Sequence, residues 1–203
     1  MWRSLEPVIL RSDCVALKPL SLEHLEGLSE AVQDGEIWRH WYTSVPAPEN
    51  MTSEIERRLR LQSDGTMMPF TVFDAHGNVV GMTTYMNIDK LNQRLEIGST
   101  WYRASVHRSA INTHAKWLLL RHAFEVLESI AVEFRTHWFN HQSRAAIERL
   151  GAKLDGVLRQ HQRLPDGSFR DTVVYSIIAS EWLAVKAHLE YQMHKPRPGV
   201  AAC

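Results

Sequence analysis

The stretch from Trp101 to Thr113 contains the residue types that could bind an anion. It reads Trp-Tyr-Arg-Ala-Ser-Val-His-Arg-Ser-Ala-Ile-Asn-Thr and joins a β-rich run to a helical pattern. The first turn of a helix has amide N–H groups without partners in the helix and a partial positive charge, so it can bind phosphate. Arg103 and Arg108 would add cationic donors. The alternative is an ordinary strand-to-helix connection with solvated arginines, because no P-loop or dinucleotide glycine pattern is present.

The chain has 11 histidines, which makes a metal site the next candidate. His137 and His141 are four residues apart, but they straddle a strand end and a loop, and no third ligand has motif spacing. His114 and His122 share a predicted helix, and we expect them at the surface or at the rim of a cleft. We therefore expect no metal site. Of the histidines, His107 is the one that we expect to contact a phosphate.

The elements that position these residues fit a single α/β (α+β) domain over residues 1–192, followed by a mobile tail over 193–203. Alternation and turn signals predict about seven strands, at 14–20, 70–74, 79–85, 94–102, 130–136, 154–163 and 171–178. Helical periodicity predicts five helices, which begin near Leu22, Thr52, Asn112, His141 and Ser180. The sheet is expected to be mostly antiparallel, and the unit from 94 to 136 can form a right-handed parallel crossover.

Composition narrows the class of partner. The 203 residues include 23 Lys and Arg and 23 Asp and Glu, so the formal net charge is zero. This argues against a nucleic-acid binder, which accumulates positive charge. No apolar run approaches the roughly 20 residues of a membrane helix, and the N-terminus does not resemble a signal peptide. We therefore expect a cytoplasmic protein that binds neither nucleic acid nor membrane.

Several segments carry a family pattern: Glu96-Ile-Gly98, the loop 107–116, the strand 132–136, and the segment 140–151. The last is the most specific, with Asn140-x-x-Ser143 followed by a helix that ends at Leu-Gly151. In these segments the chain resembles the GNAT acyl-CoA N-acyltransferases, and most of all the branch of ribosomal-protein N-terminal (Rim-type) acetyltransferases. The resemblance extends over nearly the whole chain, to about residue 190.

The resemblance assigns the anion-binding loop to the pyrophosphate of CoA. The family pattern Gln/Arg-x-x-Gly-x-Gly/Ala falls on six positions here, which are His107, Arg108, Ser109, Ala110, Ile111 and Asn112. Both glycines are replaced, and Ala110 stands where a glycine-like conformation is expected. Asn112 is expected to cap the helix and Thr113 to donate its hydroxyl. The resemblance therefore implies CoA binding with reduced affinity.

It also implies a GNAT-like fold, in which two central parallel strands splay apart and helices flank the sheet. The pantetheine arm of acetyl-CoA would pair with the backbone of Thr100, Trp101 and Tyr102, and Asn140 would bind the arm. An amine then attacks the thioester directly. Because an alkylamine is mostly protonated at pH 7, a base must accept its proton, and backbone N–H groups must stabilise the oxyanion.

The resemblance suggests two catalytic residues, each with an alternative role. Glu96 is the candidate base, since burial in an apolar strand would raise its pKa; the alternative is a structural carboxylate paired with Arg94 or a loop. Ser143 is the candidate acid toward the thiolate, or the cap of a short helix. Tyr102 and Tyr175 are alternative acids, or walls of the cleft.

Glu133 is expected to be structural rather than catalytic. From the alternation of its strand we expect its partner to be Arg144 or Lys116 and not Arg135.

The function implied is transfer of an acetyl group from acetyl-CoA to a primary amine, either a protein N-terminus or a small amine. The alternatives are an acyl-CoA-binding protein without transferase activity, which the altered loop would suit, and an unrelated interaction module. The aromatic cluster of Trp38, Trp41 and Tyr42 either shapes an acceptor pocket or packs in the core. The acceptor stays open, and a homodimer is a possibility.

Overall fold

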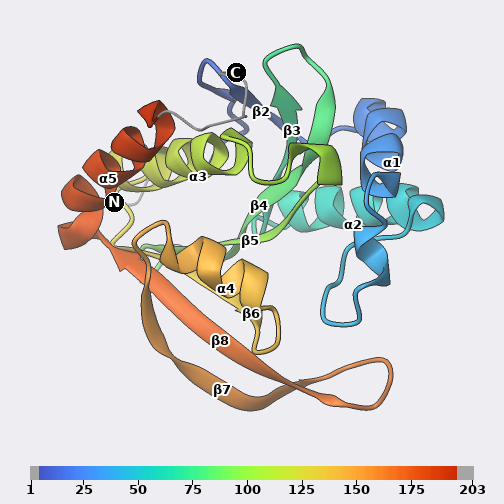
Figure 1. Cartoon of the computed structure of the whole chain (residues 1–203). Coiled ribbons are helices and arrows are strands. Elements are labelled where there is room, and N and C mark those ends of the chain that lie inside the picture. Colours follow the sequence, from blue (N-terminus) through green and yellow to red (C-terminus); the bar gives the residue numbers. More distant parts are fainter. Residues whose placement is uncertain (1–4, 196–203) are drawn as a thin grey trace.

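An eight-stranded sheet runs through the molecule in the order β1-β2-β3-β4-β5-β6-β8-β7 (Figure 1). The computed structural model describes residues 5–195; residues 1–4 and 196–203 lie outside the described part. The strands are β1 (Leu10–Arg11), β2 (Val15–Pro19), β3 (Met68–Asp74), β4 (Val79–Asp89), β5 (Arg94–Tyr102), β6 (Ala131–His137), β7 (Lys153–Arg163) and β8 (Phe169–Ile178). All neighbouring strands are antiparallel except β5 and β6, which are parallel. The expected mixed sheet is confirmed, and β1, too short to give an alternation signal, is the additional strand.

Helices cover both faces of the sheet (Figure 1). The helices are α1 (Leu25–Gln33), α2 (Met51–Ser63), α3 (Ile111–Arg121), α4 (His141–Glu148) and α5 (Trp182–His194). Short 3-10 turns precede several of them: η1 (Leu22–His24), η2 (Ile37–Arg39), η3 (Pro48–Asn50), η4 (Ala104–Val106) and η6 (Ala179–Glu181). A π-helical turn, η5 (His122–Val126), continues α3.

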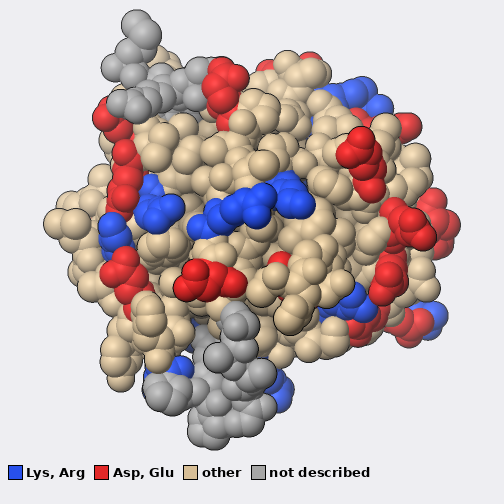
Figure 2. Space-filling model, turned by 90° about the horizontal axis from the view of Figure 1, so that it is seen from above, with Lys and Arg blue, Asp and Glu red and all other residues tan. Residues whose placement is uncertain are grey.

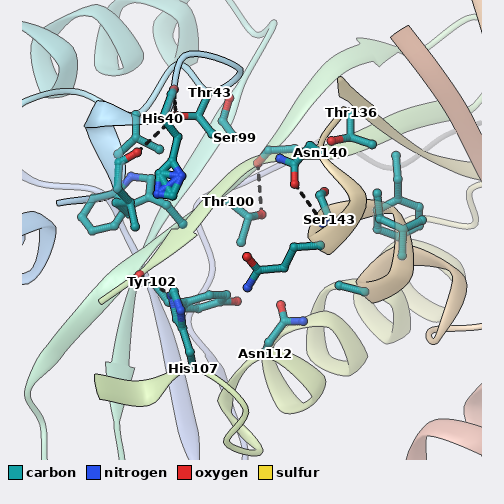
Figure 3. Close-up of a pocket in the computed structure, with 18 of the residues that line it drawn as sticks. His40, Thr43, Ser99, Thr100, Tyr102, His107, Asn112, Thr136, Asn140 and Ser143 are labelled. Atoms are coloured by element: carbon teal, nitrogen blue, oxygen red, sulfur yellow. Dashed lines mark hydrogen bonds between the residues drawn. The ribbon is translucent and has the colours of Figure 1, made fainter. Parts of the chain in front are cut away.

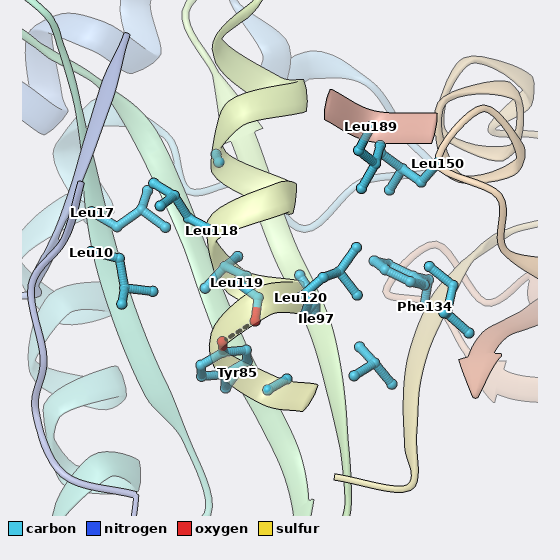
Figure 4. Packing of buried hydrophobic residues seen from close by; sticks show 14 of the residues in the cluster. Leu10, Leu17, Tyr85, Ile97, Leu118, Leu119, Leu120, Phe134, Leu150 and Leu189 are labelled. Atoms are coloured by element: carbon cyan, nitrogen blue, oxygen red, sulfur yellow. Dashed lines mark hydrogen bonds between the residues drawn. The ribbon is translucent and has the colours of Figure 1, made fainter. Parts of the chain in front are cut away.

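Two buried clusters show which helices belong to which face. Residues of α1 and α2 pack with Met82 of β4 and Trp101 of β5. The larger cluster joins α3 and α5 to the other side of the strands and includes Leu118 and Leu119, both fully buried. Figure 4 shows this packing, with the Tyr85 hydroxyl donating to the Leu119 carbonyl over 2.6 Å. The apolar stripe expected in α3 therefore supplies the main core.

Local sequence explains where the elements begin and end. The Ser21 side chain accepts a hydrogen bond from the Glu23 amide and caps η1, as expected. Gly151, with φ of +96°, follows α4 in the left-handed conformation that favours glycine. The predicted hairpins 70–85 and 154–178 form β3–β4 and β7–β8.

The central strands splay because β5 contains an irregularity. The parallel pairing of β5 with β6 covers only three residue pairs, from Arg94↔Ala131 to Glu96↔Glu133. Beyond them Ser99 has φ of +47°, and the register between β4 and β5 shifts. Ile97 packs on the α3 side, whereas Trp101 packs on the α1 and α2 side, so the inward face of β5 switches at this bulge.

Charges of both signs are interspersed on the face drawn in Figure 2, where a short row of Lys and Arg is surrounded by scattered acidic side chains. Among residues 5–195, no helix has the length and apolar character needed to cross a membrane. Met193 and His194 belong to α5. The remainder of the expected tail lies almost entirely outside the described residues, so its mobility stays a prediction.

Candidate functional site

A cavity of about 880 Å³ opens where β5 and β6 separate. Its walls come from the second half of β5, the start of α3, the end of β6, α4 and the segment 35–45. Figure 3 shows Thr100, Asn112, Asn140 and Ser143 around this space. The fold thus brings together segments that are far apart in the sequence.

Eight of the residues expected to bind CoA line this cavity: Thr100, Trp101, Tyr102, His107, Arg108, Ser109, Asn112 and Asn140. Three others do not. Ala110 and Ile111 pack against the core, and Thr113 is buried, with its hydroxyl lacking a hydrogen-bond partner in the described structure. Their contribution to CoA binding would come through backbone amides at the start of α3.

The loop before α3 adopts a conformation that its sequence permits. Ala110 is the N-cap with φ of −74°, so it needs no glycine conformation, and the left-handed residue is Arg108, with φ of +63°. The Ser109 hydroxyl accepts from the Ile111 amide over 3.3 Å and donates to the Val106 carbonyl over 2.6 Å. Asn112 lies inside the helix and not at its cap, contrary to expectation, because α3 begins one residue earlier.

Arg103 is not available for a phosphate, contrary to expectation. Its Nε lies 2.9 Å from Asp34 Oδ2, and its Nη2 lies 3.4 Å from Glu30 Oε1, so it ties β5 to α1. This pairing raises the pKa of Arg103, first through the Asp34 hydrogen bond. Arg108 remains at the cavity wall beside the start of α3.

The helix α4 is capped by Asn140 and not by Ser143. Asn140 Oδ1 accepts from the Ser143 amide over 3.0 Å (Figure 3). Both residues line the cavity, and the cap fixes the position of the Ser143 backbone. The Ser143 hydroxyl is therefore not used as a cap.

Glu96 lies directly behind the cavity wall and is only 4% exposed. Its Oε2 accepts from Asn87 Nδ2 over 2.7 Å and lies 3.6 Å from Arg135 Nε. Burial raises the pKa of Glu96 above its usual value, and this effect exceeds the opposing effects of Asn87 and Arg135. A Cβ added at Gly98, which lines the cavity, would lie 2.8 Å from Glu96 Oε1. Glycine therefore leaves the carboxylate within reach of the cavity.

The prediction that Glu133 pairs with Arg144 or Lys116, and not with Arg135, was wrong. Arg135 Nη2 donates to Glu133 Oε2 over 2.9 Å, and Arg94 binds the other carboxylate oxygen. Residues i and i+2 of a strand share a face, so Glu133 and Arg135 are neighbours. Because Arg94 is engaged here, it is not the partner of Glu96.

Lys116 is a residue at the cavity whose importance the sequence did not indicate. It lines the cavity and is buried, and its ammonium donates to Thr100 Oγ1 over 2.7 Å and to Thr83 Oγ1 over 3.3 Å. Burial lowers the pKa of Lys116 to about 7. A signal was present, because Lys116 follows Asn112 by four residues and so shares its helix face.

The aromatic cluster divides between the core and the cavity mouth. Trp38 packs against the core of α1 and α2. Trp41 is 56% exposed, and its ring centroid lies 4.9 Å from that of His137, while Tyr42 lines the cavity. Phe139, also exposed, completes this group, with its ring centroid 5.7 Å from that of His137.

The histidines of α3 and η5 are buried and not at the surface, contrary to expectation. His114 Nδ1 lies 3.0 Å from Ser12 Oγ, and the His122 ring stacks on Tyr85. Within residues 5–195, no group of three or more His, Cys, Asp or Glu side chains is arranged to hold a metal ion.

Comparisons with known proteins agree with this geometry. Residues 15–153 match the family model described as "Acetyltransferase (GNAT) domain". Over 106 residues the chain is 34% identical to a Bacillus subtilis (strain 168) protein named "Putative ribosomal N-acetyltransferase YdaF". That match covers 52% of this chain and 57% of the relative, so it spans little more than half of the relative's length.

Two solved structures have the same fold. A GCN5-related N-acetyltransferase from Brucella melitensis is 28% identical, with a TM-score of 0.83, over 93% of this chain and 86% of that one. Mycobacterium smegmatis RimJ, solved in complex with CoA-disulfide, is 22% identical, with a TM-score of 0.76, over 92% of this chain and 93% of that one.

Proposed function

The chain belongs to the GNAT acetyltransferase family, and we propose that it transfers an acetyl group from acetyl-CoA to a primary amine. The observation that carries this proposal is the cavity between the separated ends of β5 and β6. The start of α3 lines it, and the buried carboxylate of Glu96 lies directly behind Gly98 of its wall. The helix N-terminus suits the pyrophosphate of the cosubstrate. The carboxylate suits an amine acceptor, which must lose a proton in the reaction.

Acetyl-CoA fits the residues on the α3 side of the cavity. Beyond Glu96, the edge of β5 no longer pairs with β6, so backbone groups around Thr100 to Tyr102 can pair with the pantetheine arm on that side. The Tyr102 carbonyl already lies 3.0 Å from His107 Nε2. The start of α3 offers amide N–H groups, and Arg108 adds a cation beside it, which suits the pyrophosphate. Asn140, at the start of α4, faces the same space.

We assign the proton transfers to Glu96 and Ser143. The amine nitrogen attacks the thioester carbon, and the amine proton passes to Glu96 directly or through a water molecule. The raised pKa of Glu96, caused by burial, makes its carboxylate a better base than an exposed one. When the carbon–sulfur bond breaks, the CoA thiolate takes a proton from the Ser143 hydroxyl, which recovers one from solvent.

The acceptor is a small amine or a protein N-terminus. The name of the Bacillus relative makes a ribosomal-protein N-terminus a natural first acceptor to test. The cytoplasmic location expected from the sequence stays a prediction, and the oligomeric state stays open between monomer and homodimer.

The test is thiol release from acetyl-CoA over a panel of amines and N-terminal peptides. We expect acetyl-CoA to raise Tm, and at least one acceptor to give turnover. Glu96→Gln should lower kcat by about 10²-fold or more, the typical contribution of a general base, without weakening acetyl-CoA binding. Glu56→Gln on the exposed face of α2 is the matched control and should leave kcat unchanged.

The outcomes separate the alternatives. Binding of acetyl-CoA without turnover of any acceptor would favour the non-catalytic acyl-CoA binder. No binding at millimolar acetyl-CoA would reject both the acetyltransferase and the non-catalytic acyl-CoA binder. Unchanged kcat in Glu96→Gln would reject Glu96 as the base.

A further inference from the structure

We propose that Arg170 and His137 form a carboxylate-binding subsite on the acceptor side of the cavity, so that the acceptor is an amine that also carries a carboxylate. The inference rests on the proposed acetyl transfer and names the class of its acceptor. Both residues line the cavity, and each presents a buried donor that has no acceptor in the described structure.

Among the described residues, the Arg170 side chain has no hydrogen-bond or ion-pair partner, unlike Arg58 and Arg135, which line the same cavity. Arg58 Nε lies 2.6 Å from Glu54 Oε1, and Arg135 Nη2 lies 2.9 Å from Glu133 Oε2, so both are engaged in ion pairs. Within residues 5–195, the Arg170 side chain makes no hydrogen bond or ion pair, and its buried Nε has no partner. Glu96 acts on it only through its charge. A guanidinium in this state retains its charge and its donors for a ligand.

His137 supplies the second donor through its tautomer. Its Nδ1 accepts from the Phe139 amide over 3.1 Å, so in the neutral ring the proton must be on Nε2. The ring is neutral at pH 7 because burial, assisted by the charge of Arg170, lowers the pKa of His137. His137 is 3% exposed, and its Nε2 lacks a partner in the described structure. A buried donor without an acceptor is unfavourable, and a ligand oxygen at this position would accept its hydrogen bond.

The two donors are close to each other and to Glu96. On adjacent strands, His137 of β6 pairs with Thr172 of β8, which is two residues from Arg170. His137 and Arg170 are therefore diagonal neighbours, with Cα atoms about 7–8 Å apart. The charge of Arg170 acts on both His137 and Glu96. A ligand bound by Arg170 and His137 would therefore lie beside the proposed base.

The phosphates of CoA are not the partner of this pair. On β6, Val132 and Phe134 pack in the α3-side core, so Glu133, Arg135 and His137 point to the opposite face. The pyrophosphate end at α3 therefore lies on the other side of the sheet.

One unpaired guanidinium and a neutral imidazole suit a monoanion, which favours a carboxylate over a phosphate dianion. The carboxylate could belong to a small amino acid or to an acidic residue near a peptide N-terminus.

The experiment compares matched acceptors that differ only in this charge. The first arm uses ω-amino acids of two to six carbons and their primary amides. The second uses N-terminal tetrapeptides with Asp or Glu at the second or third position against Asn or Gln. Affinity is measured by calorimetry with the CoA-saturated protein, and turnover is measured separately with acetyl-CoA. The variants are Arg170→Gln and His137→Phe, with Arg163→Gln, an exposed arginine of the same hairpin, as control.

We expect at least one carboxylate to bind about 10-fold or more tightly than its amide, the ratio for one charge-assisted hydrogen bond. Arg170→Gln should abolish this ratio, His137→Phe should reduce it, and Arg163→Gln should retain it. The arm in which the ratio appears identifies the source of the carboxylate.

The inference is overturned if no carboxylate exceeds its amide in either arm, or if the ratio survives Arg170→Gln. Failure of the proposed function gives a different result: the ratio is present in binding, but no acceptor is acetylated. Turnover of amides and carboxylates with equal KM would support acetyl transfer and reject the subsite.

Discussion

At the residue scale, the site depends on polar side chains whose burial changes their chemistry. Glu96 is held behind Gly98 with Asn87 on one carboxylate oxygen, and its pKa is raised by burial. Lys116 is buried on the opposite side of β5, bound only to the hydroxyls of Thr83 and Thr100 in the hydrogen bonds described. A carboxylate and an amine with pKa values moved toward neutrality thus flank the same cavity, as is common at functional sites.

The buried amine of Lys116 makes stability depend on pH. Its pKa falls from 10.5 in the unfolded chain to about 7 when folded, so between these values the unfolded chain binds more protons. The free energy of unfolding should therefore gain a contribution from Lys116 as pH rises from about 7 to 10, on the order of a few kcal/mol in total. Lys116→Met should flatten this dependence and be the more stable protein at pH 7.

The free energies of unfolding of the wild type and of Lys116→Met are measured with urea at pH 7, 8.5 and 10. Other titrating groups contribute equally to both proteins, so they cancel in the difference between the two free energies. Parallel pH profiles for the two proteins would contradict a lowered pKa at Lys116.

At the element scale, the bulge in β5 connects the sheet to the site. Before Ser99 the strand directs Ile97 toward α3, and after it Trp101 faces α1 and α2. The same irregularity coincides with the end of pairing to β6, which opens the cavity. A regular strand would continue the ladder and close this space.

Substitutions at Ser99 should therefore change stability according to the conformation they allow. Its φ of +47° is disfavoured for β-branched residues, so Ser99→Val should lower the free energy of unfolding by about 1–2 kcal/mol. Ser99→Gly should remain within about 1 kcal/mol of the wild type, because glycine adopts this φ freely. Denaturant unfolding gives both values, and acetyl-CoA titration should detect weaker binding only in the valine variant. Equal stability of the two variants would reject a conformational role for this position.

At the scale of the whole molecule, the core on the α3 side joins the sheet to α3 and α5. It thereby fixes the positions of β5 and β6, which carry the two walls of the site. The strands β5 and β6 share only three residue pairs, so this core must fix their relative position beyond the point where they separate. The 23 basic and 23 acidic residues balance, and charges of both signs are interspersed on the face drawn in Figure 2.

Removal of core volume should accordingly destabilise the entire domain. Leu118→Ala, at a fully buried position of α3, should lower the free energy of unfolding by about 2–5 kcal/mol. Leu183→Ala on α5, where the side chain is 80% exposed, is the matched control and should stay within about 0.5 kcal/mol. Guanidinium unfolding measures both, and similar losses would mean that α3 does not anchor the core.

The sequence by itself determined the order and type of the elements and the family. Periodicity located all the longer strands and helices, because apolar spacing and caps are local properties. The segment Asn140-x-x-Ser143 and the loop from His107 identified the family and led to eight residues that line the cavity. The two-residue β1 was missed, since a strand so short has no periodic signal.

Only the tertiary structure decided which polar groups are paired and which are free. Arg103 binds Asp34, Arg135 binds Glu133, and the Arg170 side chain has no partner within residues 5–195, although all three look alike in the sequence. The pairing of charges depends on contacts between residues far apart in the chain and on which face of a strand each occupies after a bulge. Burial, and with it the raised pKa of Glu96 and the lowered pKa of Lys116, is likewise a property of the packed fold.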